Sequence, residues 1–312
     1  MKDTGIKQTI EKLKGIIPAD QVLEDEPMSR HTSFRIGGPA AAFVTVCDEE
    51  QLSAVLSAVT AAGAEHMVIG NGSNLLVSDE GYPGIMIKLG GSFEEIEQDA
   101  DDPCRARAGA AALMSRVSAF LTAHGLSGFE FASGIPGSMG GAVFMNAGAY
   151  GGEIKDVVRA VRTMDPDGSN ARYVSGEDMQ FSYRHSMAED EGVLILFAEM
   201  ELTPDDPAAI EERVAELQAK RNSKQPVNYP SAGSTFKRPV GGYAAALIEQ
   251  SGLKGFRVGG AEVSEKHSGF VINTGGATCE DVLAVMRHVR EKVLEDSGIT
   301  LEPEVRLINC SL

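Results

Sequence analysis

A glycine-rich segment at residues 128–152 constrains this chain more than any other stretch. Its sequence is GFEFASGIPGSMGGAVFMNAGAYGG. Glycines and small residues leave backbone N–H groups uncovered, so that a phosphate can lie directly against the main chain. Residues 134–138 predict a rigid turn that leads into a short helix, whose N-terminus favours an anion. An ordinary loop between strands is the alternative, but glycines clustered between aromatic residues favour a ligand-binding segment.

A second glycine turn, at residues 70–77, follows a predicted buried strand at 67–69. A tight Gly-Asn-Gly turn at the end of a βαβ unit is a usual place for a nucleotide phosphate. The turn lacks the third glycine of the dinucleotide fingerprint, and no GxxxxGK[ST] motif occurs in the chain. The sequence therefore supports neither a Rossmann site nor a Walker loop.

The composition narrows the classes of partner. The chain has 312 residues and a net charge of −17, from 28 basic and 45 acidic residues. Such acidity argues against nucleic acid, because binding phosphates along a strand requires a basic face. A small anionic ligand remains compatible if a few cations line its site. No apolar run approaches membrane-spanning length and residues 1–18 do not resemble a signal peptide, so we expect a cytoplasmic protein.

The four cysteines are far apart in the sequence. Cys47, Cys104, Cys279 and Cys310 show no CxxC spacing. This pattern predicts ordinary thiols, with neither disulfides nor a zinc site, and we expect no metal.

Hydrophobic periodicity predicts a mixture of helices and strands. The predicted helices cover residues 3–17, 49–62, 111–124, 208–223, 244–250 and 279–296. The predicted strands cover residues 42–46, 67–69, 157–164, 172–174, 193–201, 261–263, 270–272 and 305–308, with further short strands between 85 and 110. Pro18 is expected to end the first helix. Residues 181–186 are expected to form a polar loop.

Three cations, Lys220, Arg221 and Lys224, lie near the C-terminal end of the helix predicted at 208–223. The helix dipole favours cations at that end, which is a sufficient explanation for them. In so acidic a chain the same cluster also suggests an anion site, and the residues alone leave both interpretations open.

Five motifs, in order along nearly the whole chain, together resemble the UDP-N-acetylenolpyruvoylglucosamine reductase (MurB) family. They are the glycine-rich segment, the turn at 70–76, Ser-Tyr-Arg at 182–184, Gly-Ser-Thr-Phe-Lys at 233–237 and Leu-Glu-Pro-Glu-Val-Arg at 301–306. Each motif is weak alone, but their order is specific. Because the 181–186 loop leads into the next strand after only a few residues, the chain resembles the shorter, type II form of the family.

The resemblance implies an α+β fold. A two-subdomain FAD-binding module of the vanillyl-alcohol-oxidase (PCMH) type is followed by a C-terminal α+β substrate-binding domain. The corresponding division is 1–30 for an N-terminal helix and lead-in, 31–204 for the FAD-binding module with subdomains 31–92 and 93–204, 205–300 for the substrate-binding domain, and 301–312 for a C-terminal strand that carries Glu304.

The family's reaction is the NADPH-dependent reduction of UDP-N-acetylglucosamine enolpyruvate to UDP-N-acetylmuramate, a step of peptidoglycan precursor synthesis. The reduced double bond carries a carboxylate, so the chemistry needs a cation on that carboxylate and a proton for the adjacent carbon. The resemblance gives these roles to Arg184 and Ser234, with Glu304 as a second acid. From the residues alone, a turn serine bonded to its own backbone is the better explanation of Ser234. Arg184 as a structural ion pair and Glu302 in place of Glu304 also remain open.

For the cofactor, the resemblance implies non-covalent FAD, with NADPH as co-substrate. The expected FAD-binding residues are Asn71, Gly72, Ser73, Asn74, Leu75, Gly134, Ile135, Pro136, Gly137, Ser138, Gly140, Gly141, Asn146, Ala147 and Gly148. The expected substrate-binding residues are Tyr183, Arg221, Lys224 and Lys237. A side chain at position 140 is expected to intrude where the backbone approaches a phosphate. His31 and His185 are expected to take no part in catalysis, and we expect a monomer.

Two other functions remain open. A different flavin oxidase or dehydrogenase of the same fold would need a base for substrate oxidation and no UDP site. A non-catalytic nucleotide-sugar binder would bind UDP without flavin and would be colourless.

Overall fold

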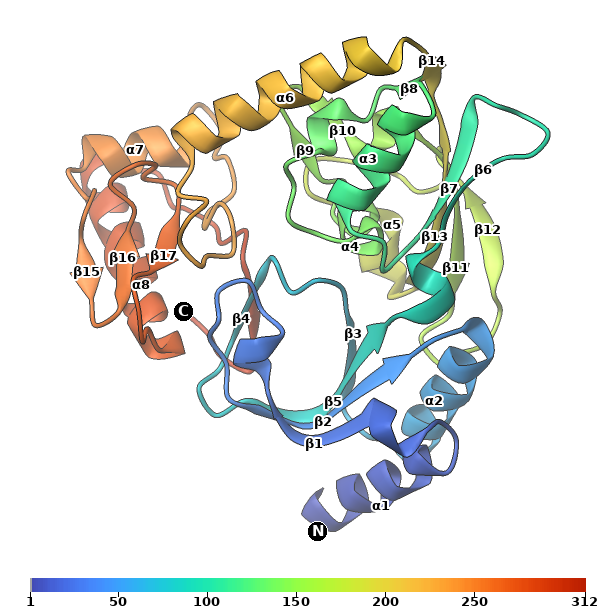
Figure 1. Ribbon diagram of the computed structural model, residues 1–312. Coiled ribbons are helices and arrows are strands. Elements are labelled where there is room, and N and C mark those ends of the chain that lie inside the picture. Colours follow the sequence, from blue (N-terminus) through green and yellow to red (C-terminus); the bar gives the residue numbers. More distant parts are fainter. Residues whose placement is uncertain (1) are drawn as a thin grey trace. The chain divides into compact units, whose positions relative to one another are not determined.

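A computed structural model describes residues 2–312, with side chains from residue 5 onward (Figure 1). Met1, with which the predicted N-terminal segment begins, lies outside the described residues. The chain divides into two compact units, each assembled from separate stretches of sequence. The first unit contains the residues up to 24 together with 42–71 and 84–220, and the second contains 25–41, 72–83 and 221–312.

The helices agree closely with the hydrophobic periodicity. They are α1 (Lys2–Lys14), α2 (Glu49–Ala61), α3 (Met114–Ala123), α4 (Met139–Phe144), α5 (Met187–Glu191), α6 (Pro207–Lys224), α7 (Ala244–Gln250) and α8 (Cys279–Ser297), with 3-10 turns at Ala19–Gln21, Met28–Arg30, Gly91–Glu94, Glu130–Ala132 and Ile154–Asp156. Pro18 does not end α1, because the helix already ends at Lys14. There the N–H of Gly15 donates to the carbonyl oxygen of Lys12. Helix α5 begins within the stretch expected to lead from a loop straight into a strand.

The strands are short and numerous. They are β1 (Val22–Pro27), β2 (Pro39–Val46), β3 (His66–Ile69), β4 (Leu75–Val77), β5 (Tyr82–Leu89), β6 (Ile96–Gln98), β7 (Arg105–Gly109), β8 (Leu126–Ser127), β9 (Gly148–Ala149), β10 (Gly152–Glu153), β11 (Val158–Met164), β12 (Arg172–Ser175), β13 (Leu194–Glu201), β14 (Thr203–Pro204), β15 (Arg257–Val258), β16 (Ala261–Val263), β17 (Val271–Asn273) and β18 (Arg306–Ile308).

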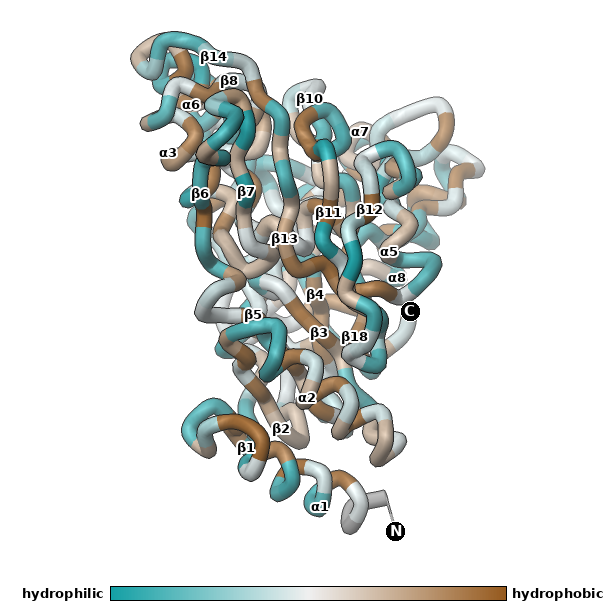
Figure 2. The backbone as a smooth tube through the Cα atoms, turned by 90° about the vertical axis from the view of Figure 1, so that its right-hand side faces the viewer, coloured by the Kyte–Doolittle hydropathy of each residue, from teal (hydrophilic) through white to brown (hydrophobic). Residues whose placement is uncertain are grey.

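A five-stranded antiparallel sheet, in the order β12-β11-β13-β7-β6, forms the framework of the first unit. Helix α4 packs against β13 and β7, so the middle of the glycine-rich segment lies on this sheet. Buried and outward-facing side chains alternate along β7, as expected for a strand of a sheet that is covered on one face. Ala106 and Ala108 are buried, whereas the side chain of Arg107 lies over the ring of Phe197. Figure 2 shows the hydrophilic residues that β11 and β12 carry between hydrophobic ones.

A four-stranded sheet, in the order β1-β2-β5-β3, precedes it in the chain. Helix α2 connects β2 to β3 and begins at Asp48, whose carboxylate accepts the N–H of Gln51 at 2.8 Å. Strands β3 and β5 are parallel, so the 70–74 turn leaves the carboxyl end of β3, as the sequence predicts.

The second unit contains the antiparallel sheet β15-β16-β17, against which α8 packs (Figure 1). Helix α8 starts with a capping box formed by Thr278 and Asp281 and ends at Gly298, whose φ is 71°. Strand β18 pairs in parallel with β4, joining the end of the chain to the segment that follows the 70–74 turn. The predicted α+β fold is confirmed. Hydrophobic periodicity missed helix α5 and strands β1, β4, β8, β9, β10, β14 and β15, and the predicted domain boundaries stay a prediction.

Candidate active site

The turn after β3 exposes backbone donors. Gly72 has a φ of 62°, and a Cβ there would lie 2.0 Å from the carbonyl oxygen of His31, so the position requires glycine. Within the part of the chain that the structure describes, the N–H groups of Gly72, Ser73 and Asn74 donate to no protein acceptor. Successive N–H groups of this kind suit the oxygens of a phosphate.

Within the first unit, the glycine-rich segment contacts Gly70 and Asn71, the last two residues before this turn. The amide of Asn71 donates to the carbonyl oxygen of Pro136 at 2.8 Å, and a Cβ on Gly70 would lie 2.4 Å from the hydroxyl of Ser138. That hydroxyl is buried and has no hydrogen-bond partner among the described residues. Because a buried polar group without a partner costs free energy, Ser138 suits a polar ligand such as the FAD diphosphate. The residues present therefore fit the predicted cofactor.

Two adjacent glycines, Gly140 and Gly141, have different roles. A Cβ on Gly140 would lie 2.7 Å from the Cβ of Ala110, and the N–H of Gly140 donates to the carbonyl oxygen of the same residue at 2.8 Å. The sequence-based reason for this glycine was therefore wrong: it allows α4 to pack against the end of β7. A Cβ on Gly141 would meet only the Ser138 hydroxyl, at 3.7 Å.

Arg184 lies in a tight hairpin. Ser182 and His185 exchange backbone hydrogen bonds of 3.1 and 3.3 Å, which leaves Tyr183 and Arg184 at the turn, with Arg184 at a φ of 57°. The guanidinium of Arg184 lies 3.4 Å from the carbonyl oxygen of Gly148 and over the ring of Tyr183, at 5.1 Å from its centroid. The hairpin thus presents a cation and a half-exposed aromatic ring together.

Asn146 anchors this hairpin. Its side chain is fully buried; the amide donates to the carbonyl oxygen of Ser182 at 2.9 Å and to the carboxylate of Glu153 at 3.2 Å. Its oxygen accepts the N–H of Lys155 at 3.0 Å. On the other side of the hairpin, the hydroxyl of Ser186 donates to a carbonyl oxygen at the end of α4, at 2.7 Å. The glycine-rich segment and Arg184 are thereby joined by buried hydrogen bonds.

Acidic side chains lie on both sides of the hairpin. The hydrogen bond from Lys155 lowers the pKa of Glu153, and the positive charge of Arg184 contributes to the same shift. A structural ion pair for Arg184 therefore remains open. His185 lies between two carboxylates of α5, 3.2 Å from Glu189 and 3.0 Å from Asp190. These contacts raise the pKa of His185, that with Glu189 most strongly. His31 forms a similar 3.0 Å contact with Glu26.

Ser234 and Glu304 lie on neighbouring segments of the second unit. The N–H of Glu304 donates to the carbonyl oxygen of Thr235 at 2.9 Å, and the amide of Asn74 donates to the carbonyl oxygen of Glu304 at 3.0 Å. The hydroxyl of half-buried Ser234 has no hydrogen-bond partner among the described residues, so the alternative of a turn serine bonded to its own backbone is not found. Glu304 is half-buried and Glu302 is exposed, which favours Glu304.

The predicted cations differ in their surroundings. Lys220 is paired with Glu216 on the same helix at 2.7 Å, which agrees with a structural role. Lys224 is exposed, and Lys237 is half-buried with its N–H bound to the carbonyl oxygen of Glu302. Within the described residues, neither Lys224 nor Lys237 forms an ion pair.

The predicted site residues thus form two groups. Arg184 lies in the first unit with the glycine-rich segment, whereas Ser234, Glu304 and Lys237 lie in the second with residues 72–75. The sequence motifs missed the anchoring role of Asn146 and the contribution of Ser186. The anchoring role of Asn146 is indicated by its left-handed backbone, with a φ of 42°. That conformation is visible only in the structure, so the sequence alone did not reveal the role.

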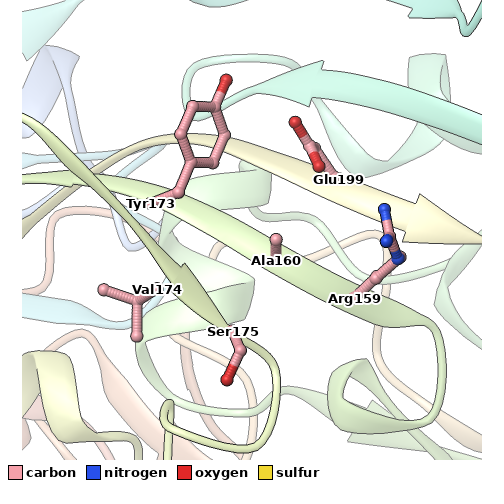
Figure 3. A pocket seen from close by; sticks show the side chains of 6 residues that line it. All are labelled: Arg159, Ala160, Tyr173, Val174, Ser175 and Glu199. Atoms are coloured by element: carbon pink, nitrogen blue, oxygen red, sulfur yellow. The ribbon is translucent and has the colours of Figure 1, made fainter.

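A depression of about 430 Å³ on the five-stranded sheet contains none of the predicted site residues (Figure 3). Its lining comes from β11, β12 and β13 and consists of Arg159, Ala160, Tyr173, Val174, Ser175 and Glu199. Figure 3 shows the polar ends of Tyr173, Glu199 and Arg159 projecting from the strands. Among the described residues, no helix combines the length and apolar character that a membrane span requires.

Comparison with known proteins gives consistent matches along the chain. Residues 40–172 match the FAD binding domain family, and residues 225–308 match the C-terminal domain family of UDP-N-acetylenolpyruvoylglucosamine reductase. The UDP-N-acetylenolpyruvoylglucosamine reductase of Agathobacter rectalis is 48% identical over 99% of this chain and 99% of that protein. The reductase of Caldanaerobacter subterraneus subsp. tengcongensis is 43% identical over 96% and 97%. The crystal structure of the Thermus caldophilus reductase (MurB) aligns with a TM-score of 0.78 and 35% identity, over 91% of this chain and 97% of that one.

Proposed function

Because the chain belongs to the UDP-N-acetylenolpyruvoylglucosamine reductase family, we propose that it reduces UDP-N-acetylglucosamine enolpyruvate to UDP-N-acetylmuramate with NADPH and FAD. The sequence motifs predict both the family and an FAD-dependent oxidoreductase, and the comparisons confirm both predictions. The finer assignments below are proposals about individual residues.

FAD is held by main-chain donors of two segments. The uncommitted N–H groups of Gly72, Ser73 and Asn74 and the unpartnered hydroxyl of Ser138 support this assignment. Gly141 lies near Ser138, and a Cβ on it would meet only the Ser138 hydroxyl, at 3.7 Å. When bound, FAD would supply hydride-transfer chemistry between NADPH and the substrate double bond. We infer that the cofactor is non-covalent, because His31 contacts Glu26 and His185 contacts Glu189 and Asp190.

Arg184 binds the carboxylate of the enolpyruvyl group. Its planar guanidinium matches a carboxylate, and its positive charge stabilises the enolate that forms when the double bond is reduced. The left-handed backbone at Arg184 is an unfavourable conformation, which the Asn146 and Ser186 contacts hold in place. Tyr183 contributes to the same substrate contact.

Ser234 delivers the proton to the carbon next to the carboxylate. The observation that carries this assignment is the pairing of the Ser234 loop with the segment before β18, through the Glu304 N–H and the carbonyl oxygen of Thr235. This pairing keeps an unpartnered hydroxyl close to the Glu304 segment, where the carboxyl group acts as a second acid. A hydroxyl is a weak acid, so it requires polarisation by these neighbours.

The UDP group binds to cations of the second unit. Lys237 and Lys224 are the main candidates because neither is engaged in an ion pair within the described residues, and Arg221 lies on the same helical end as Lys224. The enzyme functions as a monomer. It functions in the cytoplasm, where NADPH and nucleotide sugars are available. As part of this proposal, the chain is divided into an FAD-binding module and a substrate-binding domain, as the sequence predicts.

Rapid mixing of S234A with each reactant in turn tests the proposal. Flavin reduction by NADPH needs no proton for the sugar, so this half-reaction should match that of the unsubstituted protein. Reoxidation by the enolpyruvyl sugar should slow by roughly 10² or more, the usual scale for losing a positioned acid. S234C should recover part of the rate, because a thiol is the stronger acid.

Equal slowing of both half-reactions would give Ser234 only a role in shaping its loop. Oxygen consumption with a simple alcohol would favour a different flavin oxidase. A colourless protein that binds UDP would favour a binding protein without catalysis.

A further inference from the structure

Thr235 is a buried polar residue next to Ser234, the proposed proton donor. Its side chain is 4% exposed, and its hydroxyl accepts the N–H of Val271 at 3.0 Å. A buried hydroxyl or N–H group without a partner costs free energy, so these two groups satisfy each other. The hydroxyl of Thr235 is thus committed within the protein, whereas that of Ser234 is not.

The backbone of Thr235 is fixed on two sides. Its N–H donates to the carbonyl oxygen of Gly269 at 2.8 Å, and its carbonyl oxygen accepts the N–H groups of Glu304 and Val305, at 2.9 and 3.5 Å. Thr235 therefore joins the segment that enters β17 to the segment that leads to β18.

Ser234 has no comparable support of its own. Within the part of the chain that the structure describes, residues 232–234 form no backbone hydrogen bond. Gly233 precedes Ser234 at a φ of 76°, and a Cβ there would meet nothing within 4 Å. The last paired residue before this stretch is Ser231, which forms a bridge with Ile272. The first anchored residue after it is Thr235, so the orientation of Ser234 depends on Thr235.

The partners of Thr235 belong to a packed framework. Val271 is the first residue of β17, which pairs with β16 (Figure 1). The carbonyl group that accepts the Thr235 N–H follows Ser268, which is 3% exposed and whose hydroxyl donates to the carbonyl oxygen of Ala245 in α7 at 2.6 Å. Because these partners are fixed, a change in the Thr235 side chain is expected to move Thr235 and Ser234 rather than the framework.

We propose that Thr235 is a positioning residue for proton delivery: the bond between its hydroxyl and the Val271 N–H fixes the direction in which the Ser234 hydroxyl points. This inference rests on the proposed role of Ser234 as the proton donor. Proton transfer requires the donor to be held close to the accepting carbon, and a small displacement of the donor slows it. Because Thr235 is buried, it acts through Ser234 and not by contact with the substrate.

Two substitutions separate the hydroxyl of Thr235 from its shape. T235V keeps a similar shape but removes the acceptor for the Val271 N–H, whereas T235S keeps the hydroxyl and removes the methyl group. The flavin-loaded variants are reduced with NADPH and mixed rapidly with UDP-N-acetylglucosamine enolpyruvate at several concentrations. This measures the maximal rate of flavin reoxidation separately from the sugar concentration that gives half of it.

The maximal rate of reoxidation should fall roughly tenfold in T235V, because the donor is displaced. Flavin reduction by NADPH and the sugar concentration at half-maximal rate should both stay unchanged. T235S should retain the rate within about twofold, because it keeps the hydrogen bond to the Val271 N–H.

The double variant S234A/T235V gives a readout that a purely structural role would not produce. If Thr235 acts through Ser234, adding T235V to S234A should slow reoxidation no further, because the positioned donor is already absent. The matched control is T163V, which removes a hydroxyl from a buried threonine of β11 that donates to the carbonyl oxygen of Arg172 at 3.3 Å. Its reoxidation rate should match that of the unsubstituted protein. If T235V does not fold, T235A carries the test, since it also lacks the hydroxyl but leaves room for a water on the Val271 N–H.

The outcomes distinguish this inference from the proposed function. An unchanged reoxidation rate in folded T235V, or a further slowing in the double variant, would overturn the inference and leave the role of Ser234 standing. Loss of the rate in T235S would also contradict it, because the hydroxyl would then not be the group that positions Ser234. If S234A itself reoxidises at the unsubstituted rate, the proposed role of Ser234 fails and this inference fails with it.

Discussion

Replacing Asn146 with alanine tests whether one buried amide connects the glycine-rich segment to the Arg184 hairpin. The substitution removes hydrogen bonds to Ser182, Glu153 and Lys155. Ser182 and Lys155 are exposed residues whose backbone groups can bind water, so their loss costs about 1 kcal/mol together rather than the full penalty for buried groups. The emptied site adds about 1 kcal/mol.

The backbone adds a further contribution. Asn146 has a φ of 42°, which alanine adopts at a cost of about 1 kcal/mol relative to asparagine. The total is about 3 kcal/mol, which corresponds to a fall of roughly 5–10 °C in the midpoint of thermal unfolding for a protein of this size. N170A is the matched control, because Asn170 has a φ of 52° but is exposed. Its loss should be close to the backbone contribution of about 1 kcal/mol, because the hydrogen bond from its amide to Asp165, at 3.2 Å, is exposed and contributes little.

Calorimetry and rapid-mixing kinetics together measure the outcome. Because the hairpin carries Arg184, reoxidation of reduced flavin by the enolpyruvyl sugar should slow in N146A, whereas reduction by NADPH should not. N146G should regain about 1 kcal/mol of stability through the relaxed backbone, without regaining the rate. The reasoning fails if N146A unfolds within a degree of the unsubstituted protein, or if N170A is equally destabilised.

Three further predictions concern the cofactor, the substrate and pH. G141A should keep its thermal stability but lose flavin affinity by tenfold or more, whereas G140A should lose stability through its collision with β7; an equal ratio of flavin to protein absorbance in G141A would contradict the cofactor site. K237A and K224A should raise the KM for the sugar nucleotide about tenfold for each 1.4 kcal/mol of binding removed, with NADPH reduction unchanged; an unchanged KM would place the UDP site elsewhere. Because the pKa of His185 is raised in the folded protein, its ion pairs stabilise below the unfolded pKa of about 6.5 and are lost as the pH rises through the folded pKa. H185Q should therefore be less stable than the unsubstituted protein at pH 5.5, by under about 1 kcal/mol, and equally stable at pH 9; a difference that grows with pH would refute this.

Sequence periodicity predicted the elements whose stability is mostly local. Helices α2 and α8 carry their own side-chain caps and apolar faces, so their bounds came out within a residue or two. Strand β1 and helix α5 are short, and packing by distant residues decides their conformation. Pro18 was expected to end α1, but the helix ends before Gly15. A proline therefore marks the furthest point that a helix can reach, and the helix can end before it.

The candidate site was predictable in its residue types but not in their contacts. Gly140 was expected to face a phosphate and instead faces Ala110, because the direction of a missing Cβ depends on which element packs beside it. The amide of Asn146 was expected at the cofactor and is bound within the protein. The parallel pairing of β18 with β4 joins residues more than 200 positions apart, which no local pattern reports.

Anaerobic reoxidation of the NADPH-reduced protein by UDP-N-acetylglucosamine enolpyruvate tests the central claim most directly. The purified protein should be yellow, its flavin absorbance should bleach with NADPH, and one equivalent of the enolpyruvyl sugar should restore it, with one equivalent of UDP-N-acetylmuramate formed. In solvent D₂O, one deuterium should appear on the carbon next to the carboxylate, since that proton reaches the substrate through Ser234. Flavin that stays reduced in the presence of the sugar, or that is reoxidised only by oxygen, would contradict the account.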